Sequence, residues 1–361
     1  MIERPISRRS FVAGTAFLAM SAAIGMMTGC SGGSTSSSAG GSNAAQGGSN
    51  GEPIVMVWLP DNSSADLSGA RDVIAAAITS ACGRPAEMLT TVDYNVAIES
   101  ITAGKAHMAL LGSEGYVQAN KKNPAVKAAF TNSDENGGLD GACYYSRICV
   151  LSENADGYKK GDTYSIDNIK GKTFSFVSAT STSGFKVPSS SIVDNFGLEN
   201  SDVLLEPGSL FSKVLFGNSH QGSAVNLLSG DAEVAAFDDV DVDMYFDLAS
   251  GEANTVGAVY KVKADAPEPF DRVRGKQFTI IGISPVLNAP VCFNEKVISE
   301  EDRKKIVEYF CSDTVANDPQ IFVDPEDENA IGIFEKDSAN TRFVEVDDAW
   351  YEPIRKLGSA S

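Results

Sequence analysis

Short apolar segments alternate with longer amphipathic segments in the first part of this chain, and this alternation constrains the fold more than any other feature. Residues 53–59 (PIVMVWL) are typical of a buried strand, and residues 65–82 have the spacing of an amphipathic helix. Strand, helix and strand then follow at 86–91, 94–104 and 107–112. Strands separated by helices of this length form βαβ units, so we expect an α/β fold built on parallel strands.

The same alternation restarts in the middle of the chain. Residues 172–179 (KTFSFVSA) predict a strand, a helix opens at Ser183, and residues 222–239 predict a further helix and strand. Two long apolar segments, residues 142–153 and 277–294, are suited to strands that cross from one lobe to another.

Two lobes are also expected because the 311 residues from Gly51 to Ser361 exceed the usual size of one domain. We assign residues 52–145 and 288–361 to lobe 1 and residues 146–287 to lobe 2. Ligands of open α/β sheets bind at the carboxyl ends of the strands, so the sequence predicts a central ligand cleft between the lobes.

The N-terminal residues predict export. Three arginines precede an uncharged apolar run at residues 11–27, and small residues follow at once, which is the layout of a signal peptide over residues 1–29. Its last residues, MTGC, resemble a lipobox, in which Cys30 carries lipid and becomes the mature N-terminus. SRRSFV also resembles a twin-arginine signal, and the choice between that route and the general secretory route stays open.

Residues 30–51 predict a flexible tether behind the lipidated cysteine, because they are rich in Gly and Ser and contain no charged or aromatic residue. A lipid, a tether and a globular part in that order describe a protein anchored to the outer face of the cytoplasmic membrane, at the cell surface or in the periplasm. The formal net charge of −19 argues against nucleic acid and anionic membrane surfaces as partners.

The cysteines after Cys30 allow disulfides in an exported protein, but their number is odd. They are Cys82, Cys143, Cys149, Cys292 and Cys311. Cys143 and Cys149 would stand about 20 Å apart on one strand, which is too far for a bridge, and we favour Cys292–Cys311. With only two histidines and no C-x-x-C pair, no metal site and no cofactor are expected.

Residues 178–188 (SATSTSGFKVP) place three hydroxyl residues, Ser181, Thr182 and Ser183, immediately before a Gly and a helix. They can cap the helix, since Ser and Thr accept hydrogen bonds from its first N–H groups. They can also form an anion cradle, in which these N–H groups and hydroxyls converge on a phosphate-like ligand. The stretch alone leaves both interpretations open.

Three segments together resemble a known family, the phosphate-, phosphite- and phosphonate-binding components of ABC importers, which have the type II periplasmic-binding-protein fold. The segments are DYNVAIESITAGKAHMALLGSEGYVQA, IKGKTFSFVSATSTSGFKVP and SHQGSAVNLLSGDAEVAAFDD. Their order and spacing are similar to those of the family, and the likeness covers most of residues 54–315. The expected fold is therefore a two-lobed α/β fold of this type, with two crossover strands.

The resemblance implies ligand-binding roles for hydroxyl, phenol, imidazole and carboxylate side chains. They are those of Ser181, Thr182, Ser183, Tyr94, Tyr116, His220, Asp238 and Asp239. Read from the residues alone, Tyr94 is an ordinary half-buried helix residue, and His220 belongs to a helix start. An acid after the strand at 233–237 can accept a proton-bearing ligand group, or it can cap a helix, and the two alternatives weigh equally.

The chain departs from the family pattern at two places. His107 stands where the family usually has Asp, at a position expected outside the cleft. No acid occurs near Asn288 or Ala289, which favours phosphate, phosphite or a small neutral-tailed phosphonate over an aminoalkyl ligand. Residues 238–247 (DDVDVDMYFD) lack the Gly of a calcium loop, and their spacing favours an amphipathic helix.

The expected function is a monomeric solute-binding lipoprotein that captures a phosphorus oxyanion and delivers it to the permease of an ABC importer. An enzyme is not expected, because no base lies near the hydroxyl triplet in sequence and GNSHQ lacks the second Gly of a nucleophile elbow. A lipoprotein that senses the ligand and signals to a membrane partner is the alternative, since one fold serves both roles.

Overall fold

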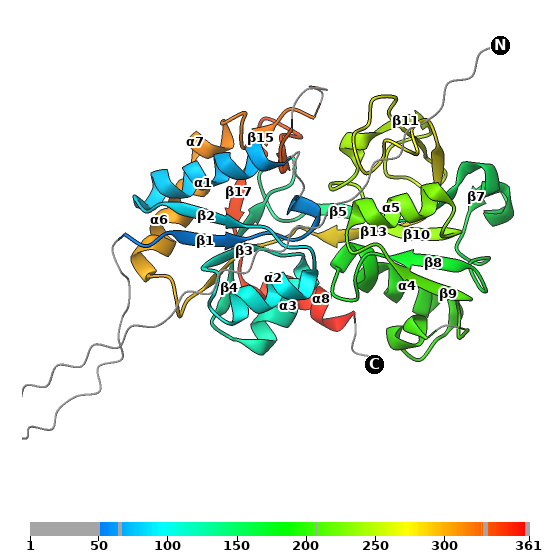
Figure 1. Ribbon diagram of the computed structural model, residues 1–361, viewed down its shortest axis with the longest axis horizontal. Helices are drawn as coiled ribbons and strands as arrows, with labels where there is room; N and C mark the ends of the chain where they lie inside the picture. The colour runs from blue at the N-terminus through cyan, green and yellow to red at the C-terminus, as the bar shows by residue number, and fades with distance from the viewer. Residues whose placement is uncertain (1–50, 64–66, 207, 326, 328–330, 358–361) are drawn as a thin grey trace, which may run out of the picture. The chain divides into compact units, whose positions relative to one another are not determined.

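Two β-sheets, each covered by helices on both faces, organise the protein (Figure 1). The structure is a computed structural model that describes residues 51–63, 67–206, 208–325, 327 and 331–357. All of them lie in one compact unit, Gln46–Ser361. The predicted signal peptide, Cys30 and most of the predicted tether lie outside the described residues.

The first sheet has six strands in the order β17-β4-β14-β3-β1-β2. Their bounds are β1 Ile54–Val57, β2 Ala86–Leu89, β3 Met108–Leu110, β4 Val126–Asn132, β14 Val291–Asn294 and β17 Phe343–Glu345. Strands β1, β2 and β3 are parallel, whereas β14 runs antiparallel to both β3 and β4.

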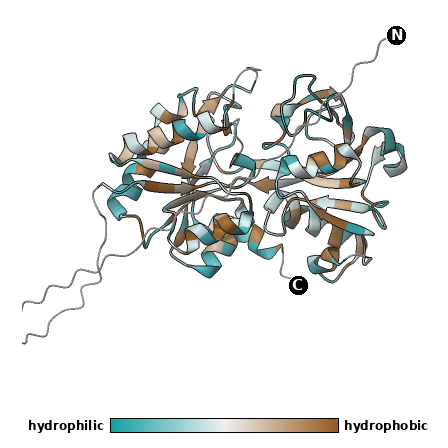
Figure 2. Cartoon of the chain, viewed as in Figure 1, coloured by the Kyte–Doolittle hydropathy of each residue, from teal (hydrophilic) through white to brown (hydrophobic). Residues whose placement is uncertain are grey.

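Helices cover both faces of this sheet. The helices on one face are α1 Ser68–Cys82, α6 Glu300–Phe310 and α7 Asp313–Ala316, and those on the other are α2 Tyr94–Thr102, α3 Ser113–Lys122 and α8 Glu352–Lys356. Side chains of a strand alternate between the two faces, so Met56 packs with the first group and Val57 with the second. The strands are accordingly apolar while the helices have one apolar side (Figure 2).

The second sheet has seven strands in the order β11-β12-β13-β5-β10-β8-β9. Their bounds are β5 Cys143–Leu151, β8 Thr173–Phe176, β9 Lys213–Phe216, β10 Val234–Asp238, β11 Phe246–Ser250, β12 Val259–Val262 and β13 Gln277–Leu287. Helix α5, His220–Ser229, covers one face and helix α4, Val187–Phe196, covers the other. Two small pairs complete the strands, β6 Lys159–Lys160 with β7 Thr163–Tyr164 and β15 Phe322–Val323 with β16 Phe334–Glu335.

The predicted α/β class and the two crossover strands are confirmed, but the expected parallel arrangement holds for only some of the strands. Strands β8, β9 and β10 are parallel, as expected from the βαβ pattern. The two long crossover segments form β5 and β13, which pair with each other in antiparallel fashion over most of their length. Each sheet is therefore mixed rather than purely parallel.

The favoured Cys292–Cys311 disulfide is wrong, because both cysteines are free. Cys292 points from β14 into the cluster under α2 and α3, whereas Cys311 ends α6 and packs against the cluster on the opposite face. Cys143 and Cys149 do share the strand β5 and are free as well. A sheet thus separates the favoured pair.

The amphipathic helix expected within residues 238–247 is also wrong. A short 3-10 turn, Asp243–Tyr245, leads directly into strand β11. Tyr245 and Phe246 are both buried against Phe270. A turn that leads into a strand can bury both neighbouring side chains, whereas a surface helix buries only a stripe of residues spaced three or four apart.

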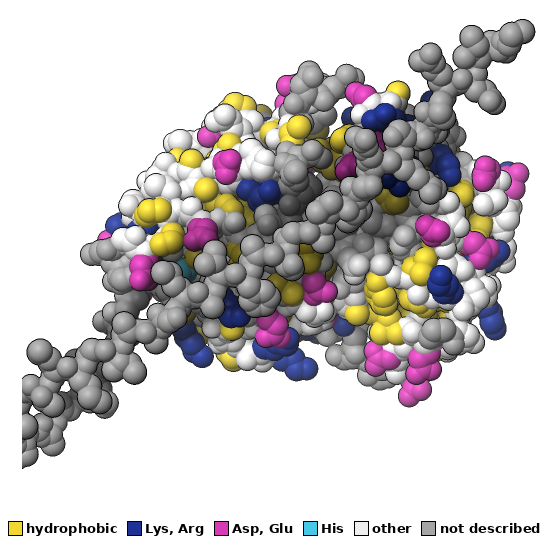
Figure 3. Space-filling view, viewed as in Figure 1, with side chains coloured by type: hydrophobic (Ala, Val, Ile, Leu, Met, Phe, Trp, Pro, Cys, Tyr) yellow, Lys and Arg dark blue, Asp and Glu magenta, His cyan; other side chains and the backbone are white. Residues whose placement is uncertain are grey.

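Charged side chains of both signs lie on the surface of the protein. On the face shown in Figure 3, acidic side chains are interspersed with basic ones rather than separated into a large basic patch. Among the residues that the structure describes, no helix combines the length and apolar character needed to cross a membrane.

Candidate functional site

The candidate site is built from residues that follow the carboxyl ends of strands in both sheets. Asp61 lies four residues after the end of β1, Tyr94 begins the helix after β2, and His220 begins the helix after β9. The hydroxyl triplet follows β8, and Asp238 is the last residue of β10. These are the strand ends at which ligands of open α/β sheets bind.

Each hydroxyl of the triplet has a different partner, and all three residues are at most 2% exposed. Ser181 caps a helical turn, since its Oγ accepts a hydrogen bond from Gly184 N at 3.0 Å. Thr182 Oγ1 accepts from Glu114 N at 2.9 Å, so it reaches α3 of the other sheet. Ser183 Oγ donates to Asp238 Oδ2 at 3.0 Å. Capping therefore accounts for Ser181 only.

Two glycines allow the close approach of backbone at this segment. A Cβ on Gly184 would lie 2.2 Å from Val177 Cγ2, which no real contact permits. A Cβ on Gly112, just before α3, would lie 2.8 Å from Thr182 Oγ1. The Gly of the Ser-Thr-Ser-Gly segment is thus required by local packing, and Gly112 leaves room for the contact between the two sheets.

His220 has one tautomer that fits its hydrogen bonds. Its Nδ1 accepts from Asp238 N at 2.9 Å, so the proton of the neutral ring must be on Nε2. Nε2 lies 3.5 Å from Ser181 Oγ, 3.4 Å from Ser183 Oγ and 3.2 Å from Asp238 Oδ2. The imidazole is therefore a hydrogen-bond donor toward the hydroxyl triplet.

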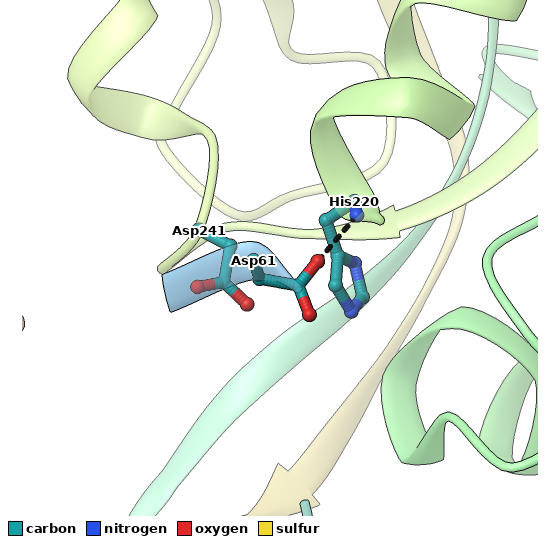
Figure 4. Close-up of side chains that lie close together, drawn as sticks. All are labelled: Asp61, His220 and Asp241. Atoms are coloured by element: carbon teal, nitrogen blue, oxygen red, sulfur yellow. Dashed lines mark hydrogen bonds between the residues drawn. The ribbon is translucent and has the colours of Figure 1, made fainter. Parts of the chain in front are cut away.

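This tautomer decides what chemistry the cluster can perform. Ser183, His220 and Asp238 resemble a nucleophile, base and acid in composition only, because Nε2 carries a proton and cannot accept one from Ser183. A metal ligand needs a free nitrogen lone pair, and neither ring nitrogen offers one. Asp61, His220 and Asp241 come within 4.8 Å of one another (Figure 4), but the imidazole does not fit the role of a ligand in a metal site.

Three carboxylates surround the imidazole. Burial, and after it the charges of Asp239 and Asp61, raises the pKa of Asp238 well above its ordinary value. Burial, and after it the charges of Asp238 and Asp61, does the same to the pKa of Asp241. Asp61 is 1% exposed, and its carboxylate accepts hydrogen bonds from His220 N at 2.6 Å and from the Tyr94 hydroxyl.

The two predicted tyrosines have different surroundings. Tyr94 donates to Asp61 inside the cluster, and burial, followed by the charge of Asp61, raises the pKa of this phenol so that it remains a donor. Tyr116 donates to Asp348 Oδ1 at 2.6 Å, and its ring packs against Tyr351. The structure therefore joins Tyr94 to the hydroxyl triplet through Asp61 and His220, and it places the Tyr116 hydroxyl beside the C-terminal segment.

The two neighbouring acids also have different surroundings. Asp238 faces Ser183 and His220, whereas Asp239 accepts from Tyr145 N at 2.9 Å, from Val240 N at 3.0 Å and from Asn254 Nδ2 at 2.8 Å. Asp239 thus holds the end of β10 against β5.

An ion pair between Arg147 and Asp243 supports this part of the sheet. Arg147 is fully buried, forms two hydrogen bonds with the carboxylate of Asp243 and lies over the ring of Tyr260 at 4.5 Å. Its Nε also donates to Asn254 at 2.8 Å. Since Asn254 binds Asp239, the ion pair is connected to the strand end that carries Asp238.

The sequence reasoning missed Asp61, Asp241 and Tyr144. Tyr144 donates to Ser183 Oγ at 3.2 Å from the crossover strand β5. Asp61 follows an apolar strand, which is the same signal that pointed to Asp238, and it was available at WLPD in the sequence. His107 lies apart from these contacts, because its Nδ1 accepts from Val55 N at 3.0 Å beside β1.

The arrangement combines hydrogen-bond donors with buried acceptors. Donors come from Tyr94, from the Nε2 and backbone N–H of His220 and from the hydroxyl triplet. The first N–H groups of α5 add the partial positive charge of a helix N-terminus. Asp238 supplies an acceptor. Such a set suits an oxyanion that still carries a proton, because that proton can be donated to a carboxylate. A fully ionised oxyanion has no proton to donate and would be repelled by the carboxylates.

One protein family and one known protein are similar to this chain in sequence. The family described as "ABC transporter, phosphonate, periplasmic substrate-binding protein" matches residues 56–351. The phosphate-import protein PhnD of Mycolicibacterium smegmatis is 25% identical over 235 residues, which make up 62% of this chain and 70% of that protein.

Two solved structures have a similar fold. One is PhnD1 of Prochlorococcus marinus in complex with methylphosphonate, at a TM-score of 0.60 and 13% identity over 85% of this chain and 97% of that one. The other is a binding protein component of an ABC phosphonate transporter from Pseudomonas aeruginosa, at a TM-score of 0.59 and 18% identity over 85% of this chain and 86% of that one. At these identities the likeness shows the fold alone.

Proposed function

The chain belongs to the family of periplasmic substrate-binding proteins of phosphonate ABC transporters, and from this membership we propose that its buried cluster binds a phosphorus oxyanion for delivery to the importer's permease. Members of this family are solute-binding proteins and not enzymes, and they act outside the cytoplasm. The ligand, the binding residues and the manner of anchoring belong to the proposal.

The observation that carries the proposal is the convergence of donors on one point. His220 Nε2, which carries the ring proton, lies 3.5 Å from Ser181 Oγ and 3.4 Å from Ser183 Oγ, at the start of a helical turn. A tetrahedral oxyanion has several oxygens and can accept from several such donors at once. We assign phosphoryl binding to the triplet, His220 and Tyr94.

We propose that Asp238 makes the site selective for ligands that carry a P–OH group. Its buried carboxyl group lies beside Ser183 and His220, where it would accept a hydrogen bond from a P–OH group. Monoprotonated phosphate and the monoanions of phosphite and methylphosphonate all fit this requirement. The relatives named above act on ligands of this kind, since one is a phosphate-import protein and another is solved with methylphosphonate.

An aminoalkyl phosphonate is a further candidate ligand beside the small, neutral-tailed ones. The sequence shows no acid near Asn288, and the structure uses the Asn288 side chain to bind Asn132 O at 2.9 Å. Asp61 and Asp241 nevertheless bring two further carboxylates to the cluster, and an ammonium group could pair with either. We expect the small, neutral-tailed ligands to bind more tightly.

Calorimetry on the purified protein tests the function. We expect one ligand per chain for at least one of phosphate, phosphite, methylphosphonate and 2-aminoethylphosphonate, and no turnover of a phosphate ester. Heat from none of the four, or release of phosphate from an ester, would contradict the proposal. The same titration with sulfate serves as a control, because a dianion without a proton has nothing to donate to Asp238.

The remaining parts of the proposal concern the whole chain. We propose that residues 52–145 with 288–361 and residues 146–287 act as two lobes of a monomer, and that lipid on Cys30 holds the protein at the membrane behind the tether of residues 30–51. Replacing Cys30 with Ser should release the protein from the membrane fraction and leave ligand binding intact. A variant that stays with the membrane after signal removal would show that another anchor exists.

A further inference from the structure

Asp61 binds the donors that the proposed ligand needs. Its carboxylate accepts from His220 N, the first residue of helix α5, at 2.6 Å, and from the hydroxyl of Tyr94. Figure 4 shows the carboxylate of Asp61 next to the imidazole and at the start of the helix. This is the environment expected for an anion, with a helix N-terminus and a phenol as donors.

Several hydrogen bonds join the backbone segment that carries Asp61 to the second sheet. Asn62 Nδ2 donates to Asp241 Oδ1 at 3.0 Å, and Arg71 Nη1 donates to Asn62 O at 2.6 Å. Gln221 Nε2 donates to Asp61 O at 3.4 Å. Residues after β1 of the first sheet are thereby bound to the start of α5 in the second sheet.

The donors cannot serve two anions. The backbone nitrogen of His220 carries one hydrogen, and so does the Tyr94 hydroxyl, so a ligand oxygen can bind either group well only when Asp61 leaves it. Hydrogen bonds of N–H and O–H groups to a charged oxygen are stronger than those to a neutral one. A carboxylate is consequently a strong competitor for these two groups.

The cluster also makes the departure of Asp61 feasible. Asp238 and Asp241 are carboxyl groups in the same cluster, and the charge of Asp61 repels both. Moving Asp61 out relieves that repulsion at the moment when a new anion enters. The incoming oxyanion therefore replaces an existing negative charge rather than adding one.

We propose that Asp61 is a built-in competitor for the ligand, whose carboxylate occupies the anion-binding donors of Tyr94 and helix α5 until a phosphorus oxyanion displaces it. This inference rests on the proposed function. It makes Asp61 a determinant of affinity and specificity, because only ligands that bind these donors better than a carboxylate does can enter.

The test compares Asp61→Ala, Asp61→Asn and the matched control Asp241→Asn by calorimetry with phosphate and methylphosphonate, on the full chain. Asp241 belongs to the same cluster but binds Asn62 and not Tyr94 or His220 N, so its variant removes a nearby charge without freeing the donors. We expect Asp61→Ala to bind about tenfold more tightly than wild type, and Asp241→Asn only about two- to threefold more tightly, from the strength of anion contacts at helix N-termini.

The outcomes separate the competitor from other roles of Asp61. Affinity for Asp61→Ala that equals or falls below that of wild type would overturn the inference, because Asp61 would then be structural or would itself contact the ligand. A gain no larger than that of Asp241→Asn would overturn it too, since charge alone would explain the change. If Asp61→Ala does not fold, Asp61→Asn keeps the shape of the side chain and carries the same comparison.

The proposed function fails in a different way. If wild type and all variants give no heat with any phosphorus compound, the function is wrong and the competitor falls with it. If wild type binds and Asp61→Ala gains nothing, only the competitor is wrong. Binding that appears in Asp61→Ala and is weak in wild type supports both.

Discussion

Two helix N-termini make contacts from one sheet to the other, and they do so with different chemistry. At α5, the N–H of His220 binds the carboxylate of Asp61, which comes from the first sheet. At α3, the N–H of Glu114 binds the hydroxyl of Thr182, which comes from the second. The first partner is an anion, which the ligand displaces under the proposal above. The second is neutral and is packed against Gly112, so the contact between the sheets has an ionic half at α5 and a neutral half at α3.

Of the changes considered, removing the three hydroxyls that follow β8 should have the largest effect on ligand affinity. Ser181, Thr182 and Ser183 changed together to Ala lose groups worth about 1.5–3 kcal/mol each to a charged acceptor. We expect the dissociation constant for the ligand to rise by roughly two to four orders of magnitude, after allowance for non-additivity. Calorimetry and thermal melting on the same protein check this. If the triplet only capped a helix, the loss would be about 1 kcal/mol of folding stability with affinity unchanged.

A side chain at position 112 should disrupt the neutral contact between α3 and Thr182. The Cβ of Gly112→Ala would lie 2.8 Å from Thr182 Oγ1, so the contact with Glu114 N must shift. We expect a loss of about 1–3 kcal/mol in the free energy of unfolding, as for other overpacked sites, together with weaker ligand binding. Gly69→Ala is the control, since a Cβ at that helix position meets nothing within 4 Å. Equal urea midpoints for both variants would show that the α3 contact is not tight.

The carboxyl cluster beside the α5 contact should make stability depend on pH, whereas the neutral α3 contact should not. Burial raises the pKa of Asp238 in the folded protein above the value of about 3.9 in the unfolded chain. The protonated Asp238 therefore contributes stability that is fully present at a pH below its pKa in the unfolded chain. This contribution is lost as the pH rises through its higher pKa in the folded protein. We therefore expect Asp238→Asn to gain stability relative to wild type with rising pH in urea titrations.

A neutral contact should show no such trend. Thr182→Val removes the acceptor of Glu114 N and leaves a buried N–H without that partner, at a cost of about 1–3 kcal/mol. Its loss of stability relative to wild type should be the same at pH 5 and pH 8. If the stability of Thr182→Val relative to wild type changed with pH as much as that of Asp238→Asn, the ionic and neutral contacts could not be distinguished in this way.

The tyrosines should give the smallest effects. Tyr94→Phe removes a donor that serves both the ligand and Asp61, so the two losses partly cancel, and we expect affinity to fall by less than about tenfold. Tyr116→Phe loses a hydrogen bond to Asp348 and should lower the unfolding free energy by about 1 kcal/mol without changing affinity. Melting temperatures and dissociation constants on both variants test this, and weaker binding by Tyr116→Phe would return Tyr116 to the site.

Much of the fold was predictable because its elements are local. The helix expected at residues 65–82 is α1, and the strand expected at 172–179 contains β8, since each follows from periodicity within one segment. The antiparallel additions to both sheets were not predictable in this way. Strand β14 pairs with β3 across nearly two hundred residues, and no local pattern specifies such a partner.

The candidate site was predictable to a lesser degree. The Ser-Thr-Ser-Gly segment can be recognised in the sequence because Ser181 caps the turn that follows it and Gly184 is required by local packing. Tyr94 and Tyr116 look alike in sequence, and only the return of the C-terminal segment brings Asp348 to Tyr116. Asp61 was overlooked because its importance depends on a helix start more than 150 residues away, and the bond that joins them has a sequence separation of 159.

The fixed tautomer of His220 has a consequence for the surroundings in which the protein works. A protein outside the cytoplasm meets dissolved divalent metals, and the carboxylates of Asp61 and Asp241 beside an imidazole are a good composition for capturing them. The backbone N–H of Asp238 occupies Nδ1 and thereby keeps a proton on Nε2, so the strongest nitrogen ligand of the cluster is withheld. One peptide hydrogen thus sets the imidazole as a hydrogen-bond donor and disfavours its use as a metal ligand, while the carboxylates stay in place.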